Sequence, residues 1–129
     1  MAPEGRDLAG SSTLRALGSV LLAAVAGRLT RYEIAEDSMF PALTAGDWVL
    51  ATKRPRRILP GQVVVFEMRP GFEAVKRVAV APPGVEGLWL LGDNPGAGSV
   101  DSRSLGPIDP ARVTARVLLR YRPLRLKAI

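Results

Sequence analysis

Short apolar runs separated by turn-forming residues follow one another along most of the chain. Each run beyond residue 30 is bounded by Gly, Pro or Asp, a pattern typical of short strands joined by turns. The runs predict strands over Arg31–Ala35, Trp48–Thr52, Gln62–Met68, Ala74–Val80, Leu88–Leu91 and Val113–Tyr121. The connecting segments lack a helical period, so we expect a mainly β fold, a compact antiparallel domain of bent sheets.

The only helical-looking segment precedes these strands. Residues 1–13 are polar and rich in Gly and Ser, which predicts a flexible N-terminus, and Leu14–Leu29 follows as a short apolar helix. Its uncharged run, Ala16–Gly27, has twelve residues, whereas about 20 are needed to span a bilayer. The hydrophobic region of a signal peptide has a similar length, and Ala-Val-Ala at residues 24–26 raises that alternative. Residues 30–129 then form a single domain.

The composition excludes whole classes of chemistry. The chain of 129 residues contains neither His nor Cys. A Ser-His-Asp or Cys-His mechanism is therefore impossible within it, as are metal sites with thiolate or imidazole ligands. Any nucleophile must be Ser, Thr, Asp, Glu or Lys, and any general base must be a carboxylate or a deprotonated lysine. We expect no metal and no cofactor.

The net charge of +6 raises the question of an anionic partner. Aromatic residues make up only 5% of the chain and are not interleaved with the basic ones, so the sequence lacks a stacking platform and we expect no nucleic acid. The basic residues cluster at Lys53–Arg57 and between Arg112 and Lys127. An anionic membrane surface fits these clusters, and so does a solvated basic face.

One serine stands out in the stretch Ala35–Leu50. Ser38 follows two acids and precedes an apolar run that is stiffened by Pro41 and bounded by a Gly46-Asp47 turn. A surface loop before a strand is one interpretation of this stretch, and a nucleophile is the other. With histidine absent, the nucleophile would need an unusual base.

A lysine lies on the apolar face of a predicted strand. In the run Phe72–Val80, alternate residues share a face, so Lys76 shares its face with Ala74, Val78 and Val80. Burial disfavours the charged form of an amine and lowers its pKa, and a neutral amine is a competent general base. The alternative is a lysine whose stem packs while its ammonium reaches solvent.

A third stretch, Leu88–Ile108, contains the most specific pattern. Gly92-Asp93-Asn94 ends an apolar run, and Asp101 and Arg103 follow a few residues later. Taken alone, this is an Asx-rich turn with a surface ion pair.

Together, three blocks resemble the type I signal peptidases, the Ser-Lys endopeptidases that include the mitochondrial inner-membrane peptidases. The blocks are Ser38-Met39 with Pro41, Leu43 and Gly46-Asp47; Gly61 through Phe66, leading to Lys76-Arg77-Val78; and Gly92-Asp93-Asn94 with Ser99, Asp101-Ser102-Arg103 and Gly106-Pro107. The resemblance covers about residues 31 to 121. It implies the signal peptidase type of fold, and three blocks in this order and spacing are a specific signal.

The resemblance assigns a role to each of these residues. Ser38 is the nucleophile, its backbone N–H is an oxyanion donor, and Lys76 is the general base. Ser99 would accept or donate a hydrogen bond at the lysine amine and orient it. The remaining residues would brace the site: Asp93 and Asn94 in its wall, and Asp101 and Arg103 as an ion pair.

The chain departs from the family pattern near the nucleophile. Glu36 stands where many bacterial members have a serine or glycine, and an ionised carboxylate cannot donate to an oxyanion. The oxyanion hole then rests on backbone alone, or Glu36 points away. Asp37 replaces a small residue, Ala42 replaces a threonine, and the four-residue segment 95–98 is one residue longer than usual.

The resemblance implies a serine endopeptidase that removes an N-terminal leader or extension from a precursor protein bound as an extended strand. Only fifteen residues separate Lys76 from Gly92, so the large insertion of bacterial signal peptidases is absent. In Trp89–Pro95 and Arg116–Tyr121 the chain is also similar to nickel-type superoxide dismutase maturation proteases. The helix before the first strand implies a catalytic domain at a membrane surface in contact with lipid, with a soluble cytoplasmic protein as the alternative.

Two other functions compete with this one. Self-cleaving Ser-Lys repressors share an S-M-x-P block and a downstream lysine, but they lack the third block, and residues 1–30 are short and apolar for a DNA-binding arm. A catalytically impaired homologue that binds peptide strands is the non-enzymatic alternative, because the acids at 36 and 37 stand next to the nucleophile.

Overall fold

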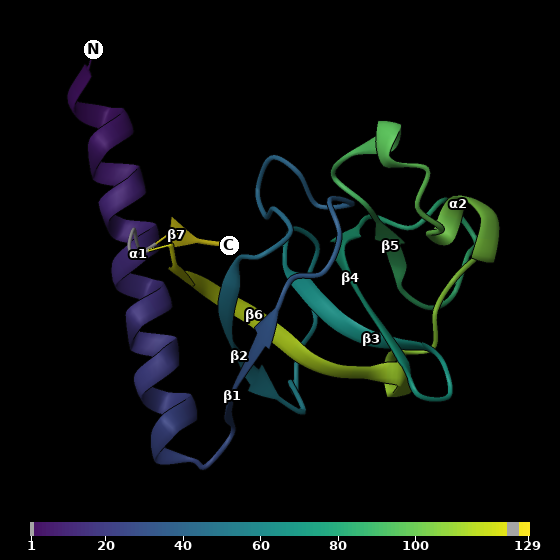
Figure 1. Ribbon diagram of the computed structural model, residues 1–129, viewed down its shortest axis with the longest axis horizontal. Coiled ribbons are helices and arrows are strands. Elements are labelled where there is room, and N and C mark those ends of the chain that lie inside the picture. The colour runs from purple at the N-terminus through teal and green to yellow at the C-terminus, as the bar shows by residue number, and fades with distance from the viewer. Residues whose placement is uncertain (1, 124–126) are drawn as a thin grey trace.

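The computed structural model describes residues 2–123 and 127–129, with side chains placed from residue 12 onward. One long helix precedes seven strands and three short helical turns (Figure 1). The elements are α1 Ala2–Val25, β1 Leu29–Glu33, β2 Trp48–Lys53, β3 Val63–Arg69, β4 Phe72–Ala79, β5 Trp89–Leu91, η1 Pro95–Ala97, α2 Ser102–Leu105, η2 Pro110–Arg112, β6 Val113–Arg122 and β7 Lys127–Ala128.

The strands form one open antiparallel sheet. Its order is β1-β2-β6-β3-β4-β5, and β7 pairs with the end of β6. Register shifts interrupt the β2–β6, β3–β4 and β3–β6 pairings, and such irregularities bend and twist a sheet. The prediction of a mainly β, antiparallel domain is therefore confirmed.

All six predicted strands are present, with shifted ends. The first begins at Leu29, which pairs with Thr52, and it ends at Glu33 rather than Ala35. The fourth ends at Ala79, so Val80 lies outside it and is 79% exposed, contrary to its predicted place in the apolar row. The two-residue strand β7 has no apolar run and was not predicted.

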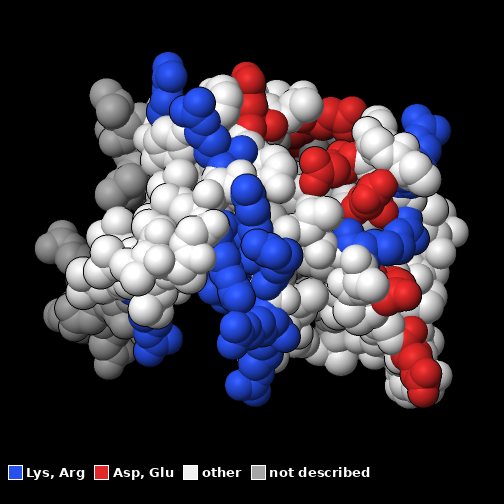
Figure 2. Space-filling view, turned by 90° about the horizontal axis from the view of Figure 1, so that it is seen from below, with Lys and Arg blue, Asp and Glu red and all other residues white. Residues whose placement is uncertain are grey.

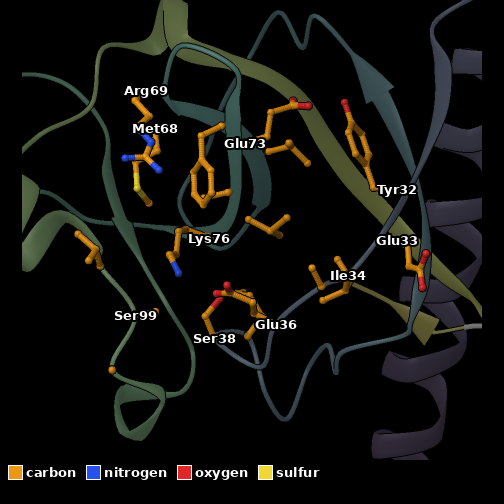
Figure 3. A pocket seen from close by; sticks show the side chains of 18 residues that line it. Tyr32, Glu33, Ile34, Glu36, Ser38, Met68, Arg69, Glu73, Lys76 and Ser99 are labelled. Atoms are coloured by element: carbon orange, nitrogen blue, oxygen red, sulfur yellow. The ribbon is translucent and has the colours of Figure 1, made fainter.

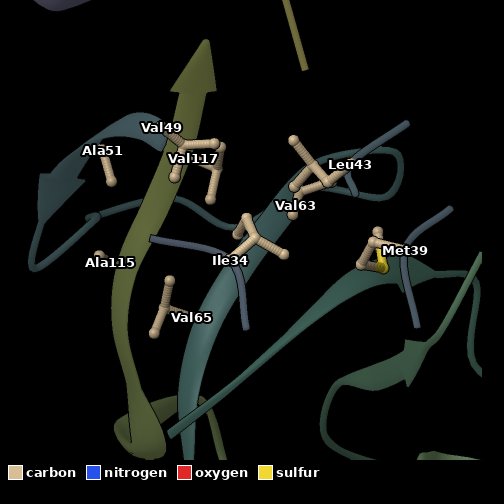
Figure 4. Packing of buried hydrophobic residues seen from close by; sticks show 9 residues of the cluster. All are labelled: Ile34, Met39, Leu43, Val49, Ala51, Val63, Val65, Ala115 and Val117. Atoms are coloured by element: carbon tan, nitrogen blue, oxygen red, sulfur yellow. The ribbon is translucent and has the colours of Figure 1, made fainter. Parts of the chain in front are cut away.

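The core lies on both faces of β3. Val63 and Val65 belong to the larger cluster of buried side chains, while Val64 and Phe66 belong to a smaller one on the other face. The larger cluster also contains Ile34, Met39, Leu43, Val49, Ala51, Ala115 and Val117 (Figure 4). Since Met39 and Leu43 come from the loop after β1, the core itself holds that loop in place.

The helix α1 differs from the prediction in both bounds. It begins at Ala2 and ends at Val25, so residues 2–13 continue the helix rather than forming a separate segment, and residues 26–27 form a turn. Extending an existing helix adds one hydrogen bond per residue, which outweighs the weak helix propensity of Gly and Ser. Among the described residues, none of the helices is both long and apolar enough to cross a bilayer.

The helix packs against β1, β2, β6 and β7 through its small residues. Ala16 and Ala23, two turns apart, are buried. The larger apolar side chains face outward: Leu14, Leu21, Leu22 and Val25 are each at least 65% exposed. An apolar helix face therefore remains uncovered.

Candidate active site

The loop that carries Ser38 is tied down at both ends and packed in the middle. Ile34 donates to the carbonyl of Asp47 at 2.8 Å, and Gly46 donates to the carbonyl of Ile34 at 2.7 Å. Met39, directly after Ser38, is 1% exposed. Ser38 itself is 8% exposed, so it is a fixed residue at the rim of the core and not a side chain of a loose surface loop.

The two aspartates of the loop stabilise its turns. The Asp37 carboxylate accepts a hydrogen bond from the backbone of Ala45 at 2.9 Å, and the Asp47 carboxylate accepts one from Thr44 at 2.9 Å. Asp37 therefore holds the loop closed across eight residues, and its carboxylate is engaged away from the serine hydroxyl.

Lys76 is buried in the middle of β4. It is 3% exposed, which decides between the two alternatives that the apolar row left open, and its neighbour on that face, Val78, is also 3% exposed. Burial lowers the pKa of Lys76, while the charges of Asp101 and Glu36 act in the opposite direction. The amine makes no hydrogen bond to any described residue, so burial is the main influence on its protonation.

Ser38, Lys76 and Ser99 converge on Gly92. A Cβ placed on Gly92 would lie 2.9 Å from the carbonyl oxygen of Ser38, 3.3 Å from Ser99 Oγ and 3.7 Å from Lys76 Nζ. Only a glycine fits, because the nearest of these atoms is backbone. In Figure 3 the lysine amine points toward the serine loop, although no hydrogen bond joins Lys76 to either serine.

The segment after β5 clamps the Ser38 loop from the other side. The backbone N–H of Asn94 donates to the carbonyl of Ser38 at 2.9 Å, and its side-chain amide donates to the carbonyl of Asp37 at 3.1 Å. The backbone N–H of Ser38 donates no hydrogen bond to any described group. Asn94 therefore fixes the peptide units around Ser38 and leaves that N–H available to a ligand.

Asp101 braces the base of the site. Its carboxylate accepts from the backbone N–H of Gly92 at 3.0 Å and pairs with the Arg103 guanidinium at 3.1 Å. Burial acts to raise its pKa, but the hydrogen bonds from Gly92 and Arg103 and the Arg103 charge hold the pKa below its usual range. Asp101 thus remains an anion that holds Gly92 against the Ser38 carbonyl.

Two residues that the sequence gave no role complete this bracing. Arg77 binds the Asp93 carboxylate through Nε at 2.9 Å and through its terminal nitrogen at 2.8 Å, and it donates to the Gly61 carbonyl at 2.8 Å. Ser102, 1% exposed, accepts from the backbone of Leu90 at 2.8 Å. Both residues stand within the sequence blocks quoted above, Arg77 in the second and Ser102 in the third, so the blocks could have suggested them.

An open cleft of about 610 Å³ extends from Ser38 and Lys76. Its walls are Tyr32–Glu36 on one side, Met68, Arg69 and Phe72–Lys76 on the other, and Gly98–Val100 beside the serine (Figure 3). Among the described strands, β1 pairs with β2 alone, and β5 pairs with β4 only from Arg77 onward, so both walls present an unpaired strand edge there. Such edges can bind an extended peptide.

Within the residues that the structure describes, no group of three His, Cys, Asp or Glu side chains is arranged to hold a metal ion. Comparison of the chain with protein-family models finds no matching family, and comparison with curated proteins finds no match.

Proposed function

We propose that this chain is a serine endopeptidase that cleaves an N-terminal leader or extension from a precursor protein, with Ser38 as nucleophile and Lys76 as general base. The observation that carries the proposal is that one cleft is lined by a nearly buried serine and by a buried lysine whose amine makes no hydrogen bond to any described residue. A chain without His or Cys has few other ways to activate a hydroxyl.

The proposed reaction uses only groups of this chain and water. Neutral Lys76 Nζ takes the proton of Ser38 Oγ as the oxygen attacks the scissile carbonyl, and the Ser38 backbone N–H stabilises the resulting oxyanion. The lysine ammonium then protonates the leaving amine, which leaves an acyl-enzyme on Ser38. Lys76 next deprotonates a water molecule that hydrolyses this ester, and the proton returns to Ser38.

The missing hydrogen bond between Lys76 and the serines is compatible with this role. Catalytic hydrogen bonds are often long before substrate binds, and they shorten in the complex. Ser99 lies beside the amine, where its hydroxyl orients the lysine once the cleft is filled. The four-residue segment 95–98, which contains η1, leads directly into Ser99.

The precursor is proposed to bind as an extended strand between the unpaired edges of β1 and β4. Small residues just before the cut and two positions further upstream fit the signal peptidase resemblance. A narrower proposal is a nickel-type superoxide dismutase maturation protease, which would carry out the same reaction on a single precursor, that of the dismutase. Incubating the chain with such a precursor and with unrelated leader peptides separates the two.

The experiment that tests the proposal is digestion of a peptide library by the full chain. Cleavage in trans that is lost in Ser38→Ala supports it, and cleavage of the chain itself alone supports a self-cleaving protein. A catalytically impaired peptide binder is the second candidate, because the charge of Glu36 favours protonated Lys76. Binding without cleavage at any pH up to 10 would favour that candidate.

The proposed working place is an anionic membrane surface, contacted by the uncovered face of α1. Figure 2 shows Lys and Arg side chains in a band beside the uncharged surface of this helix. Four exposed basic residues lie at the end of β2 and just after it: Lys53, Arg54, Arg56 and Arg57. The Lys53 N–H donates to the Arg28 carbonyl just after α1. Apolar insertion and basic charge act together in such binding. Co-sedimentation with anionic but not neutral vesicles, weakened in Leu21→Gln/Leu22→Gln, is the expected result.

A further inference from the structure

Two carboxylates of the cleft lining, those of Glu33 and Glu36, make no hydrogen bond or ion pair with any residue that the structure describes, and Glu36 is the one next to the Ser38 segment. Glu36 lines the cleft two residues before Ser38, and its side chain is exposed. The neighbouring acids Asp37 and Asp47 are both engaged with the backbone of their loop. Glu36 therefore has no structural task that would explain an acid at this position.

The charge of the cleft lining is opposite to that of the chain. The lining contains Glu33, Glu36 and Glu73 but only two basic residues, Arg69 and Lys76. Arg69 lies over the Phe72 ring at 4.9 Å, and Lys76 is neutral when it acts as a base. A concave surface that collects one sign of charge attracts ligands of the other sign, here against a net charge of +6.

A second observation, independent of the charge balance, concerns the amine of Lys76 in the same cleft. Lys76 is 3% exposed and makes no hydrogen bond to any described residue, and its amine points into the same cleft next to Glu36 (Figure 3). Glu73 lies at the far end, where it accepts from Thr114 Oγ1 at 2.8 Å. The two acids thus lie at different distances from the reacting group, and Glu36 is the nearer one.

We propose that Glu36 is a specificity-determining residue, which makes the cleft prefer precursor segments with a basic side chain next to the cut and disfavour acidic ones. The inference rests on the proposed function, because the scissile bond lies beside Glu36 only if Ser38 is the nucleophile. A lysine or arginine of the substrate would pair with Glu36 at the rim, where an exposed pair has a modest effect. We therefore expect roughly a fivefold preference for lysine over glutamine, and a larger one over glutamate.

The test uses three peptides that differ only in the residue between the two small positions upstream of the cut: Lys, Gln or Glu. Their kcat/KM values are measured with the wild-type chain, with Glu36→Gln and with the matched control Glu86→Gln, an exposed acid outside the cleft. Wild type and Glu86→Gln should rank the peptides Lys, Gln, Glu, and Glu36→Gln should treat them nearly alike. A series with the same changes just after the cut covers the other side of the bond.

Binding separates this inference from the peptidase proposal. Fluorescence anisotropy with Ser38→Ala measures the affinity for the same peptides without cleavage, and Ser38→Ala/Glu36→Gln provides the comparison. A lysine preference that disappears in the double variant supports the inference even if the wild-type chain cleaves none of the peptides. Equal binding of the three peptides, no binding of any, or a preference that persists without Glu36 would overturn it.

Discussion

Gly92 leaves no space for a side chain because the carbonyl oxygen of Ser38 lies 2.9 Å from the position its Cβ would occupy. This contact joins the end of β5 to the loop of the proposed nucleophile. Asp101, which binds the Gly92 N–H, holds the contact from the other side. The spacing of Ser38, Lys76 and Ser99 thus depends on the close contact between the backbone of Gly92 and the carbonyl of Ser38.

Gly92→Ala should separate these groups. The added methyl group meets backbone that cannot move without shifting the loop, and overpacking of this kind costs about 1–3 kcal/mol. We expect a lower midpoint of urea unfolding and a large loss of kcat. Gly96→Ala is the matched control, since its Cβ would have only an ordinary contact at 3.5 Å. Equal activity in the two variants would show that activity does not depend on the close contact between Gly92 and the Ser38 carbonyl.

Lys76→Met should stabilise the fold while it removes activity. The pKa of Lys76 is lower in the folded chain than its ordinary value of 10.5, so the folded state binds fewer protons there than the unfolded state. At pH values below the folded-state pKa, the buried ammonium of Lys76 therefore lowers the free energy of unfolding. This cost vanishes as the pH rises to about 10.5. We expect Lys76→Met to be more stable by about 1–3 kcal/mol near neutral pH, with the gain shrinking in alkali. Urea denaturation at several pH values measures this, and a gain that grows with pH would contradict it.

Asp101→Asn should lower the stability of the fold at neutral pH and have little effect in strong acid. The folded-state pKa of Asp101 is lowered, so its stabilisation is complete above the ordinary value of 3.8 and is lost as pH falls through the folded value. The amide keeps one acceptor but loses the Arg103 ion pair, at a cost of about 1–3 kcal/mol. The free energy of unfolding, measured by urea denaturation at pH 7 and at pH 2, should differ between Asp101→Asn and wild type only at pH 7. The same difference at both values, or a similar loss in Glu86→Gln, would assign the effect to something other than this ion pair.

Ser99→Ala should reduce turnover less than loss of Lys76 does. In the proposal Ser99 orients the amine but exchanges no proton with the substrate, so about a tenfold to hundredfold fall in kcat is expected, with KM little changed. Ser99→Thr, which keeps the hydroxyl, should recover part of the rate. An unchanged rate in Ser99→Ala would show that the hydroxyl does not act on Lys76.

The parts of this structure that follow from local periodicity could be predicted from the sequence. Alternation in β4 placed Lys76 on the apolar face, because a strand turns alternate side chains to one face wherever it lies. It left open whether the ammonium reaches solvent, and the structure decides for burial. The same argument failed for Val80, since it cannot locate the residue at which the strand ends. The bounds of α1 were wrong because composition gives only a weak prior on helix ends.

Contacts between distant segments were beyond such reasoning. The bond between Asp37 and Ala45 depends on how a loop closes, and the Arg77–Asp93 pair depends on the register of β4 with β5. Residue spacing encodes neither. The sequence likewise could not show that Glu36 makes no hydrogen bond with the described residues, whereas Asp37 and Asp47 accept hydrogen bonds from the backbone of their loop.

The central claim is that Lys76 is the base for Ser38, and the most direct measurement is the rate of peptide cleavage by Lys76→Arg beside wild type and Ser38→Ala across pH 6 to 10. A guanidinium keeps its proton throughout this range, so it cannot act as the base. The account predicts that the wild-type rate rises with pH and that both variants fall by at least about a thousandfold. Substantial cleavage by Lys76→Arg, with a rate that still depends on Ser38, would contradict it.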